Sequence, residues 1–94
     1  MQKLEDIKDF TDVVEFEDEG CVFKKDNRAR ASLNKTLETN YRAVYRQASE
    51  YERQWKSGDI NWCGEQFHAI TEKGKLLSFY NSEWGGVDSK EINA

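Results

Sequence analysis

The 94-residue sequence has no proline, one histidine, two cysteines and no long apolar run. No stretch approaches the roughly 18 apolar residues that indicate a membrane-spanning helix. The first ten residues, MQKLEDIKDF, also lack the apolar centre of a secretory signal peptide. These absences predict a cytoplasmic protein that makes no contact with membranes.

The scarcity of histidine and cysteine limits the chemistry open to this chain. Cys21 and Cys63 lie far apart, with no further cysteine or histidine nearby at the spacing of a metal site. We expect reduced, buried thiols and no metal or cofactor. His68 is predicted to lie on the outer face of a helix near Glu65 and Glu72, an ordinary surface arrangement. No glycine-rich phosphate loop or Ser–His–Asp signature is present, so we expect a protein that is not an enzyme.

Charge of both signs is abundant, but neither sign dominates strongly. Fourteen Lys and Arg residues against eighteen Asp and Glu residues give a net charge of −4. This balance disfavours attraction of the whole surface to nucleic acid or to anionic lipids. Aromatic residues make up 13% of the chain, which predicts a folded protein although 34% of the residues are charged. The length fits a single small domain, residues 1–94.

The first 25 residues are acidic and are predicted to form a short helix followed by a β-hairpin. Apolar residues recur at every third position from Leu4 to Phe10, as on one side of a helical turn. Residues 11–17 and 21–25 are rich in β-branched and aromatic side chains, which favours two strands. Asp18, Glu19 and Gly20 between them are predicted to form a three-residue turn.

The rest of the chain is predicted to form a helical hairpin over residues 27–84. Residues 27–56 contain neither Gly nor Pro, and their apolar residues recur at three- and four-residue intervals. Ser57–Asp59 resembles a helix end followed by a new N-cap, so a second helix is expected from residue 60, with Gly74 as a kink or an end. Residues 85–94 are predicted to be a frayed tail. The expected fold is therefore α+β and mainly α, with the N-terminal hairpin packed on a coiled-coil-like antiparallel pair of helices.

On the first of these helices, five cations recur at seven- and four-residue intervals, which places them on one face. We call this set the basic ridge: Arg28, Lys35, Arg42, Arg46 and Arg53. It is interpreted as a solvated face paired with the acidic N-terminal residues, as a contact for an acidic protein, or as a contact for nucleic-acid phosphates.

The second predicted helix carries more apolar residues than one seam can bury. Leu76, Phe79 and Trp84 are expected to leave apolar surface that another chain or a second copy covers. Trp62 is predicted to lie partly outside the apolar stripe, where an exposed indole is a natural contact anchor.

These features predict a small non-enzymatic regulator, inhibitor or adaptor that acts by protein–protein contact. The candidate contacts are the basic ridge, the acidic hairpin and the C-terminal apolar residues, and the protein is expected to bind another protein or to form a homodimer. Small acidic chains of this size often inhibit larger machines, including ones of phages and mobile elements, although this step is analogy. The alternative is a nucleic-acid-binding regulator that uses the basic ridge. The net charge is too small for a nucleic-acid mimic.

Overall fold

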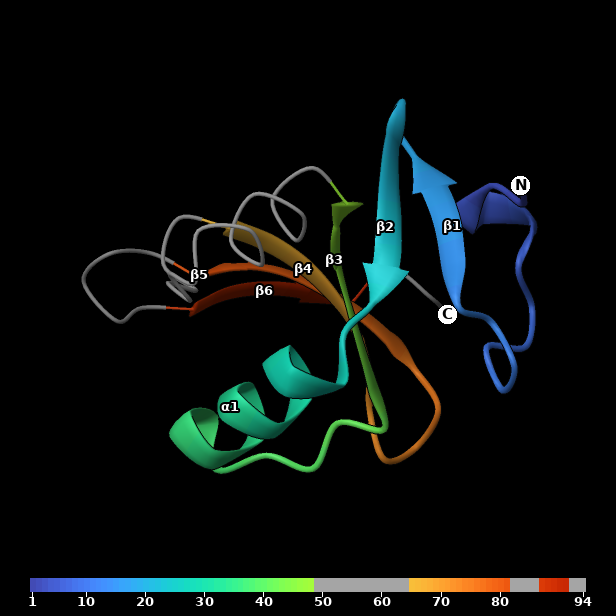
Figure 1. Cartoon of the computed structure of the whole chain (residues 1–94). Coiled ribbons are helices and arrows are strands. Elements are labelled where there is room, and N and C mark those ends of the chain that lie inside the picture. The colour runs from blue at the N-terminus through green and yellow to red at the C-terminus, as the bar shows by residue number, and fades with distance from the viewer. Residues whose placement is uncertain (49–64, 82–86, 92–94) are drawn as a thin grey trace.

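The described residues form a single antiparallel sheet with one α-helix. The computed structural model describes residues 1–48, 65–81 and 87–91. Six strands follow one another across the sheet in sequence order (Figure 1). In the chain, the helix follows the second strand and precedes the third. The elements are the 3₁₀ turn η1 (Leu4–Asp6), β1 (Glu15–Asp18), β2 (Cys21–Lys25), α1 (Asn27–Leu37), β3 (Ala43–Gln47), β4 (Glu65–Ile70), β5 (Leu76–Asn81) and β6 (Val87–Glu91). No helix in the described ranges is long and apolar enough to cross a membrane.

The prediction of a mainly α fold is wrong, because the first predicted helix stops at Leu37. Glu38 adopts a left-handed conformation with φ of 54° and ends the helix. The Asn34 side chain then fixes the reversal: its Oδ1 accepts from the Tyr41 N–H at 2.9 Å, and its Nδ2 donates to the Tyr41 carbonyl at 3.2 Å. The chain continues as β3, in which alternate residues face opposite sides of the sheet.

The second predicted helix is likewise absent from the described residues, so no helical hairpin or coiled coil forms there. Residues 65–70 and 76–81 are the paired strands β4 and β5, with Ile70 opposite Leu76. Gly74 lies in the turn between them at φ of +84°, a conformation that glycine adopts without strain. Residues 87–91 of the expected frayed tail form strand β6. The predicted helix junction at Ser57–Asp59 lies outside the described residues.

The predicted N-terminal hairpin is present, but its first strand begins at Glu15 rather than at Thr11 and its turn has two residues instead of three. The short helix expected before it is only the 3₁₀ turn η1. Asp18 pairs with Cys21, so the turn between β1 and β2 consists of two residues, Glu19 and Gly20. Both have positive φ, 50° and 81°, as a type I′ turn requires. The N-terminal segment covers the outer edge of β1, since the Glu17 N–H donates to the Gln2 carbonyl at 2.9 Å. This cover protects an edge strand that would otherwise be open to pairing.

Both faces of the sheet are buried. One core contains the apolar residues of the N-terminal segment and the residues of β1 to β5 that face it: Leu4, Ile7, Phe10, Phe16, Phe23, Ala43, Tyr45, Ile70 and Leu76. The other core lies under α1 and consists of Ala29, Leu33, Val44, Phe67, Ala69 and Phe79. Figure 1 shows α1 and the N-terminal segment well apart, with β2 and β3 between them.

A buried ion pair joins the helix to the sheet. The Asp26 carboxylate caps α1 by accepting from the N–H groups of Arg28 and Ala29 at 2.9 and 3.0 Å. Its second oxygen accepts from Arg46 Nη1 of β3 at 2.9 Å, and the two residues are only 4% and 2% exposed. Arg46, expected on the solvent face of a helix, is thus part of the interior.

Replacing Asp26 with alanine is expected to lower the free energy of unfolding by about 3–5 kcal/mol, because it removes the partner of a buried guanidinium together with a helix cap. Asp26→Asn keeps an oxygen for the cap and should lose less. Urea unfolding measures both changes, with Asp12→Asn at an exposed aspartate as the control. A loss below about 1 kcal/mol, as for a surface pair, would contradict this role for Asp26.

Candidate binding site

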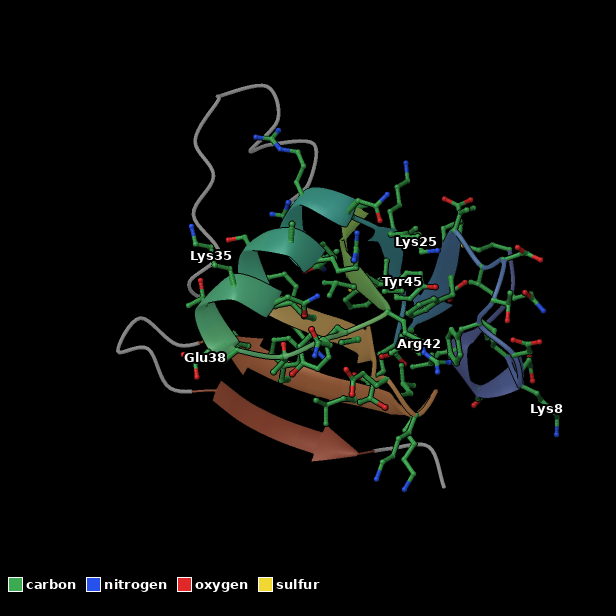
Figure 2. All side chains as sticks on the ribbon, turned by 90° about the horizontal axis from the view of Figure 1, so that it is seen from below. Lys8, Lys25, Lys35, Glu38, Arg42 and Tyr45 are labelled. Atoms are coloured by element: carbon green, nitrogen blue, oxygen red, sulfur yellow. The ribbon has the colours of Figure 1, made fainter. Side chains whose placement is uncertain are left out.

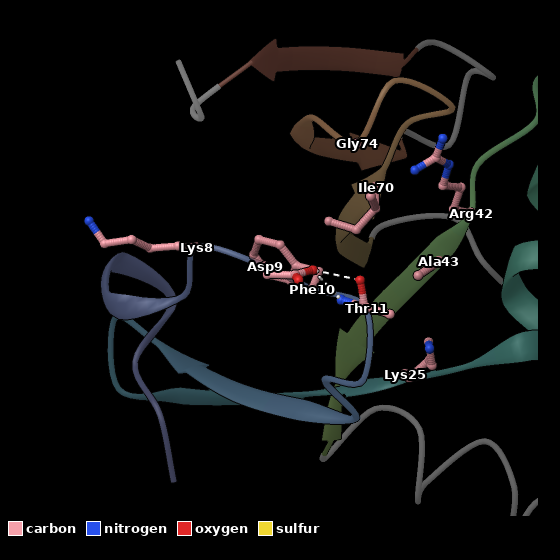
Figure 3. A pocket seen from close by; sticks show the side chains of 9 residues that line it. All are labelled: Lys8, Asp9, Phe10, Thr11, Lys25, Arg42, Ala43, Ile70 and Gly74. Atoms are coloured by element: carbon pink, nitrogen blue, oxygen red, sulfur yellow. Dashed lines mark hydrogen bonds between the residues drawn. The ribbon is translucent and has the colours of Figure 1, made fainter.

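A pocket of about 290 Å³ lies between the N-terminal segment and the sheet, at the end of β2 and β4 and the start of β3 (Figure 3). We call it the basic pocket and define it by three apolar residues and three cations: Phe10, Ala43, Ile70, Lys8, Lys25 and Arg42. Asp9, Thr11 and Gly74 complete its lining. Four different parts of the chain therefore meet there.

The floor of the basic pocket is apolar and held by the core. Ala43 and Ile70 are cross-strand partners on β3 and β4, and both are buried. Phe10 closes the floor from the N-terminal segment and packs on Tyr45, with ring centroids 6.2 Å apart. The Tyr45 hydroxyl donates to the Val13 carbonyl at 2.8 Å, which ties the segment to β3. Burial raises the Tyr45 pKa to about 12, so this hydroxyl keeps its proton.

Two cations of the sheet line the pocket beside this floor, Lys25 at the end of β2 and Arg42 just before β3. The Arg42 N–H donates to the Ile70 carbonyl at 2.7 Å, and Arg42 Nη1 lies 3.8 Å from the position that a Cβ at Gly74 would occupy. The Lys25 N–H donates to the Val14 carbonyl at 2.9 Å. Within the described ranges no carboxylate forms an ion pair with either side chain. Lys8 extends away from the pocket in Figure 3, so Lys25 and Arg42 are the cations available to a ligand.

One carboxylate also lies at the pocket, and it is already engaged. Asp9 Oδ1 accepts from the Thr11 hydroxyl at 2.6 Å and from the Thr11 N–H at 2.9 Å. The hydroxyl is the larger cause of a lowered Asp9 pKa. Asp9 therefore stays ionised near neutral pH, held by Thr11 rather than by Lys25 or Arg42.

The opposite end of the N-terminal hairpin is acidic. Glu17, Asp18 and Glu19 at the turn, together with Glu5, line a second hollow of about 350 Å³. Because β2 runs from this turn to Lys25, the acidic turn and the basic pocket lie at opposite ends of the same strands. Although the net charge is only −4, acidic and basic side chains are concentrated at opposite ends of the hairpin.

His68 is on β4, the strand between β3 and β5, and its side chain is buried, although a position on a helix surface was predicted. It is 1% exposed, and its Nε2 lies 3.0 Å from Asp18 Oδ2. The rings of Phe23 and Phe16 are 4.6 and 5.5 Å away. Nδ1 is buried and has no hydrogen-bond partner in the described part of the chain. In the tautomer in which Nε2 donates to Asp18, the lone pair of Nδ1 accepts no hydrogen bond from the described residues.

The surroundings of His68 favour its neutral form. Desolvation is the largest effect and lowers the His68 pKa, while the charges of Asp18 and Glu19 and the hydrogen bond to Asp18 oppose it. Ser78 is the cross-strand neighbour of His68 on β5, but its Oγ accepts from Gln66 Nε2 at 3.4 Å, a long bond. The Asp18–His68 pair thus has no hydrogen-bonded nucleophile among the described residues.

The structure separates the members of the basic ridge. Arg28 and Lys35 are exposed on α1, Arg42 lies in the pocket wall, and Arg46 is buried against Asp26. Arg53 lies outside the described residues, as do Trp62, Trp84 and Cys63. Cys21 is a free, half-buried thiol, whereas its burial was expected.

The candidate apolar contacts Leu76 and Phe79 are 4% and 2% exposed and belong to the two cores, so neither adds to an exposed apolar surface. Sequence reasoning missed the pairing of Asp18 with His68. The alternation of Phe67, His68, Ala69 and Ile70 was the available signal, since it places His68 on the same buried face as Ile70.

The lowered His68 pKa predicts a pH-dependent stability. Below about pH 6.5 His68 binds a proton in the unfolded state but not in the native state. The free energy of unfolding therefore falls as the pH drops from 7 toward the native pKa, by at most about 1.4 kcal/mol per pH unit. Urea unfolding between pH 7 and 5 measures the slope. His68→Gln keeps a donor for Asp18 but does not titrate, and should remove the slope. Equal slopes in both proteins would rule out His68 as the cause.

No protein-family model matches the sequence, and neither a curated protein nor a solved structure matches the chain. In addition, no group of three or more metal-ligating side chains occurs in the described part of the chain.

Proposed function

We propose that this chain is a small non-enzymatic regulator of the cytoplasm that acts by protein–protein contact, as an inhibitor or adaptor. The observation that carries the proposal is the basic pocket: Lys25 and Arg42 line it beside a buried apolar floor, and neither is paired with a carboxylate of the described residues. An apolar centre with charged groups at its rim is the usual anatomy of a protein contact.

The alternative, a nucleic-acid-binding regulator, loses its main support. It depended on five cations along one helix, and α1 carries only Arg28 and Lys35 of the five. Arg46 is buried and bonded to Asp26, so it is not available to a phosphate. Duplex binding draws most of its affinity from several cations that follow the phosphate backbone, and the basic pocket offers two beside the carboxylate of Asp9.

The affinity-tagged full chain is expected to retain a protein from a lysate of the cells that carry it, through nuclease treatment and a wash at moderate salt. Lys25→Glu/Arg42→Glu should reduce this retention, because it reverses the charge at the pocket. Lys3→Glu/Lys35→Glu changes the net charge equally at two exposed sites away from the pocket and serves as the control; Figure 2 shows Lys35 far from Arg42.

Recovery is measured by mass spectrometry of bound proteins and by staining of bound nucleic acid. Retention of nucleic acid alone, lost after nuclease or at high salt, would overturn the proposal in favour of a nucleic-acid-binding regulator. Equal loss of the protein in both charge-reversed variants would show that net charge, and not the pocket, governs the contact.

A further inference from the structure

We infer that the basic pocket binds an extended acidic peptide segment of the partner protein, with one apolar side chain between two acidic residues about three positions apart. This inference rests on the proposed function and adds the chemistry of the ligand. It follows from the spacing of the two cations, the character of the floor, the size of the pocket and the position of Asp9.

The register of the sheet sets the distance between the two cations. Lys25 is opposite Tyr45 on β3, and Arg42 precedes Tyr45 by three residues. Three residues of strand correspond to about 10 Å, so the two backbone positions are separated by roughly that distance along β3 and by one strand spacing across it. An extended peptide covers the same distance in about three residues. The interval between the two acidic residues therefore matches the separation of the two backbone positions.

The floor supplies the contact for the apolar side chain. Phe10, Ala43 and Ile70 are buried by the fold, yet they line the pocket and present apolar surface to it. Ala43 contributes only a methyl group opposite Ile70, which leaves room above this pair of strands. A side chain such as leucine that enters the pocket removes apolar surface of both partners from water.

The size of the pocket favours a side chain over a whole cofactor. Its volume of about 290 Å³ lies at the lower limit of sites for small molecules, which usually measure about 300–1,000 Å³. One apolar side chain with part of its backbone suits this volume.

Asp9 distinguishes a peptide from a phosphate. Its carboxylate is ionised at neutral pH, and only Oδ1 is taken up by Thr11. The other oxygen is an acceptor for a peptide N–H, whereas a phosphate has no N–H to donate. Two cations with one free carboxylate oxygen therefore match the carboxylates and backbone of an acidic peptide.

Fluorescence polarisation with the purified full chain tests this inference. The probe is a fluorescein-labelled peptide, Ser-Gly-Glu-Leu-Ser-Glu-Gly-Ser. Two matched peptides replace Leu with Ser or both Glu residues with Lys. We expect binding of the first peptide, at least tenfold weaker binding when Leu is absent, and no binding of the Lys peptide. Chemical shifts of the Phe10, Arg42 and Ile70 amides should change on titration with the first peptide.

Three variants locate the site. Lys25→Glu/Arg42→Glu should weaken binding of the acidic peptide at least tenfold, and the milder Lys25→Gln/Arg42→Gln should weaken it less. Lys3→Glu/Lys35→Glu should leave it within about twofold, because screening limits the reach of distant surface charges to roughly 10 Å. Thermal unfolding of each variant checks that a loss of binding is not a loss of structure.

Equal binding of the peptide without Leu would overturn the inference, as would equal weakening in the control variant. Inorganic phosphate or a single-stranded oligonucleotide that displaces the peptide more effectively than free glutamate does would also overturn it, in favour of a phosphate site. If no acidic peptide binds while the tagged chain still retains a protein through its pocket, this inference fails and the proposed function stands. If the retained molecule is nucleic acid, both fail.

Discussion

Asp26 connects three parts of the molecule through one residue. Its carboxylate caps α1 and pairs with Arg46, and its own N–H donates to the Val44 carbonyl at 2.8 Å. The position of α1 and the neutralisation of a buried guanidinium therefore depend on the Asp26 side chain, and the backbone of the same residue bonds to β3. A buried charge is tolerated only where it is paired and hydrogen-bonded, so neither Asp26 nor Arg46 can leave this arrangement alone. The route of the chain from β2 through α1 into β3 is thereby fixed.

The location of the basic pocket follows from this route. With β3 fixed beside β2, Lys25 at the end of one strand and Arg42 just before the other come to the same end of the sheet. The N-terminal segment closes the pocket from the opposite side, held by the hydroxyl of Tyr45. The pocket is thus built by long-range contacts, and its cations come from parts of the chain that have no periodic relation to each other.

The local N-terminal features were predictable from the sequence, and the order of the later elements was not. The turn at Glu19 and Gly20 carries its own glycine, and the apolar residues from Leu4 to Phe10 indicated their buried side. The helix end at Glu38 has no such signal, because a residue other than glycine adopts the left-handed conformation there. The reversal is held by a hydrogen bond from the Tyr41 N–H to the side chain of Asn34, seven residues earlier.

The prediction of one long helix over residues 27–56 was wrong because helical and strand spacings of apolar residues overlap in this part of the sequence. Leu33 of α1 and Val44 of β3 belong to the same core, and Leu37 packs against this core. The three- and four-residue spacing of apolar residues therefore continues across the boundary between helix and strand. Residues 43–46 are all buried, so β3 shows no alternation of apolar and polar residues, and the charged Arg46 made the segment resemble a helix face. The partner that permits this burial, Asp26, lies twenty residues earlier. The prediction that Leu76 and Phe79 leave exposed apolar surface was also wrong, because they lie on β5 and face the two opposite cores.

The separation of charge gives the proposed contact its selectivity. A uniformly acidic surface would repel an acidic ligand everywhere, and a uniformly basic one would attract nucleic acid without distinction. Here the carboxylates of Glu17, Asp18 and Glu19 gather at the hairpin turn, whereas the basic pocket, at the other end of β2, has Lys25 and Arg42 beside the carboxylate of Asp9. At physiological salt the screening length is about 8 Å, shorter than the length of β2, at about 3.3 Å per residue over five residues. An acidic segment at the pocket is therefore attracted by the nearby cations, while the distant carboxylates act mainly against its docking elsewhere on the surface.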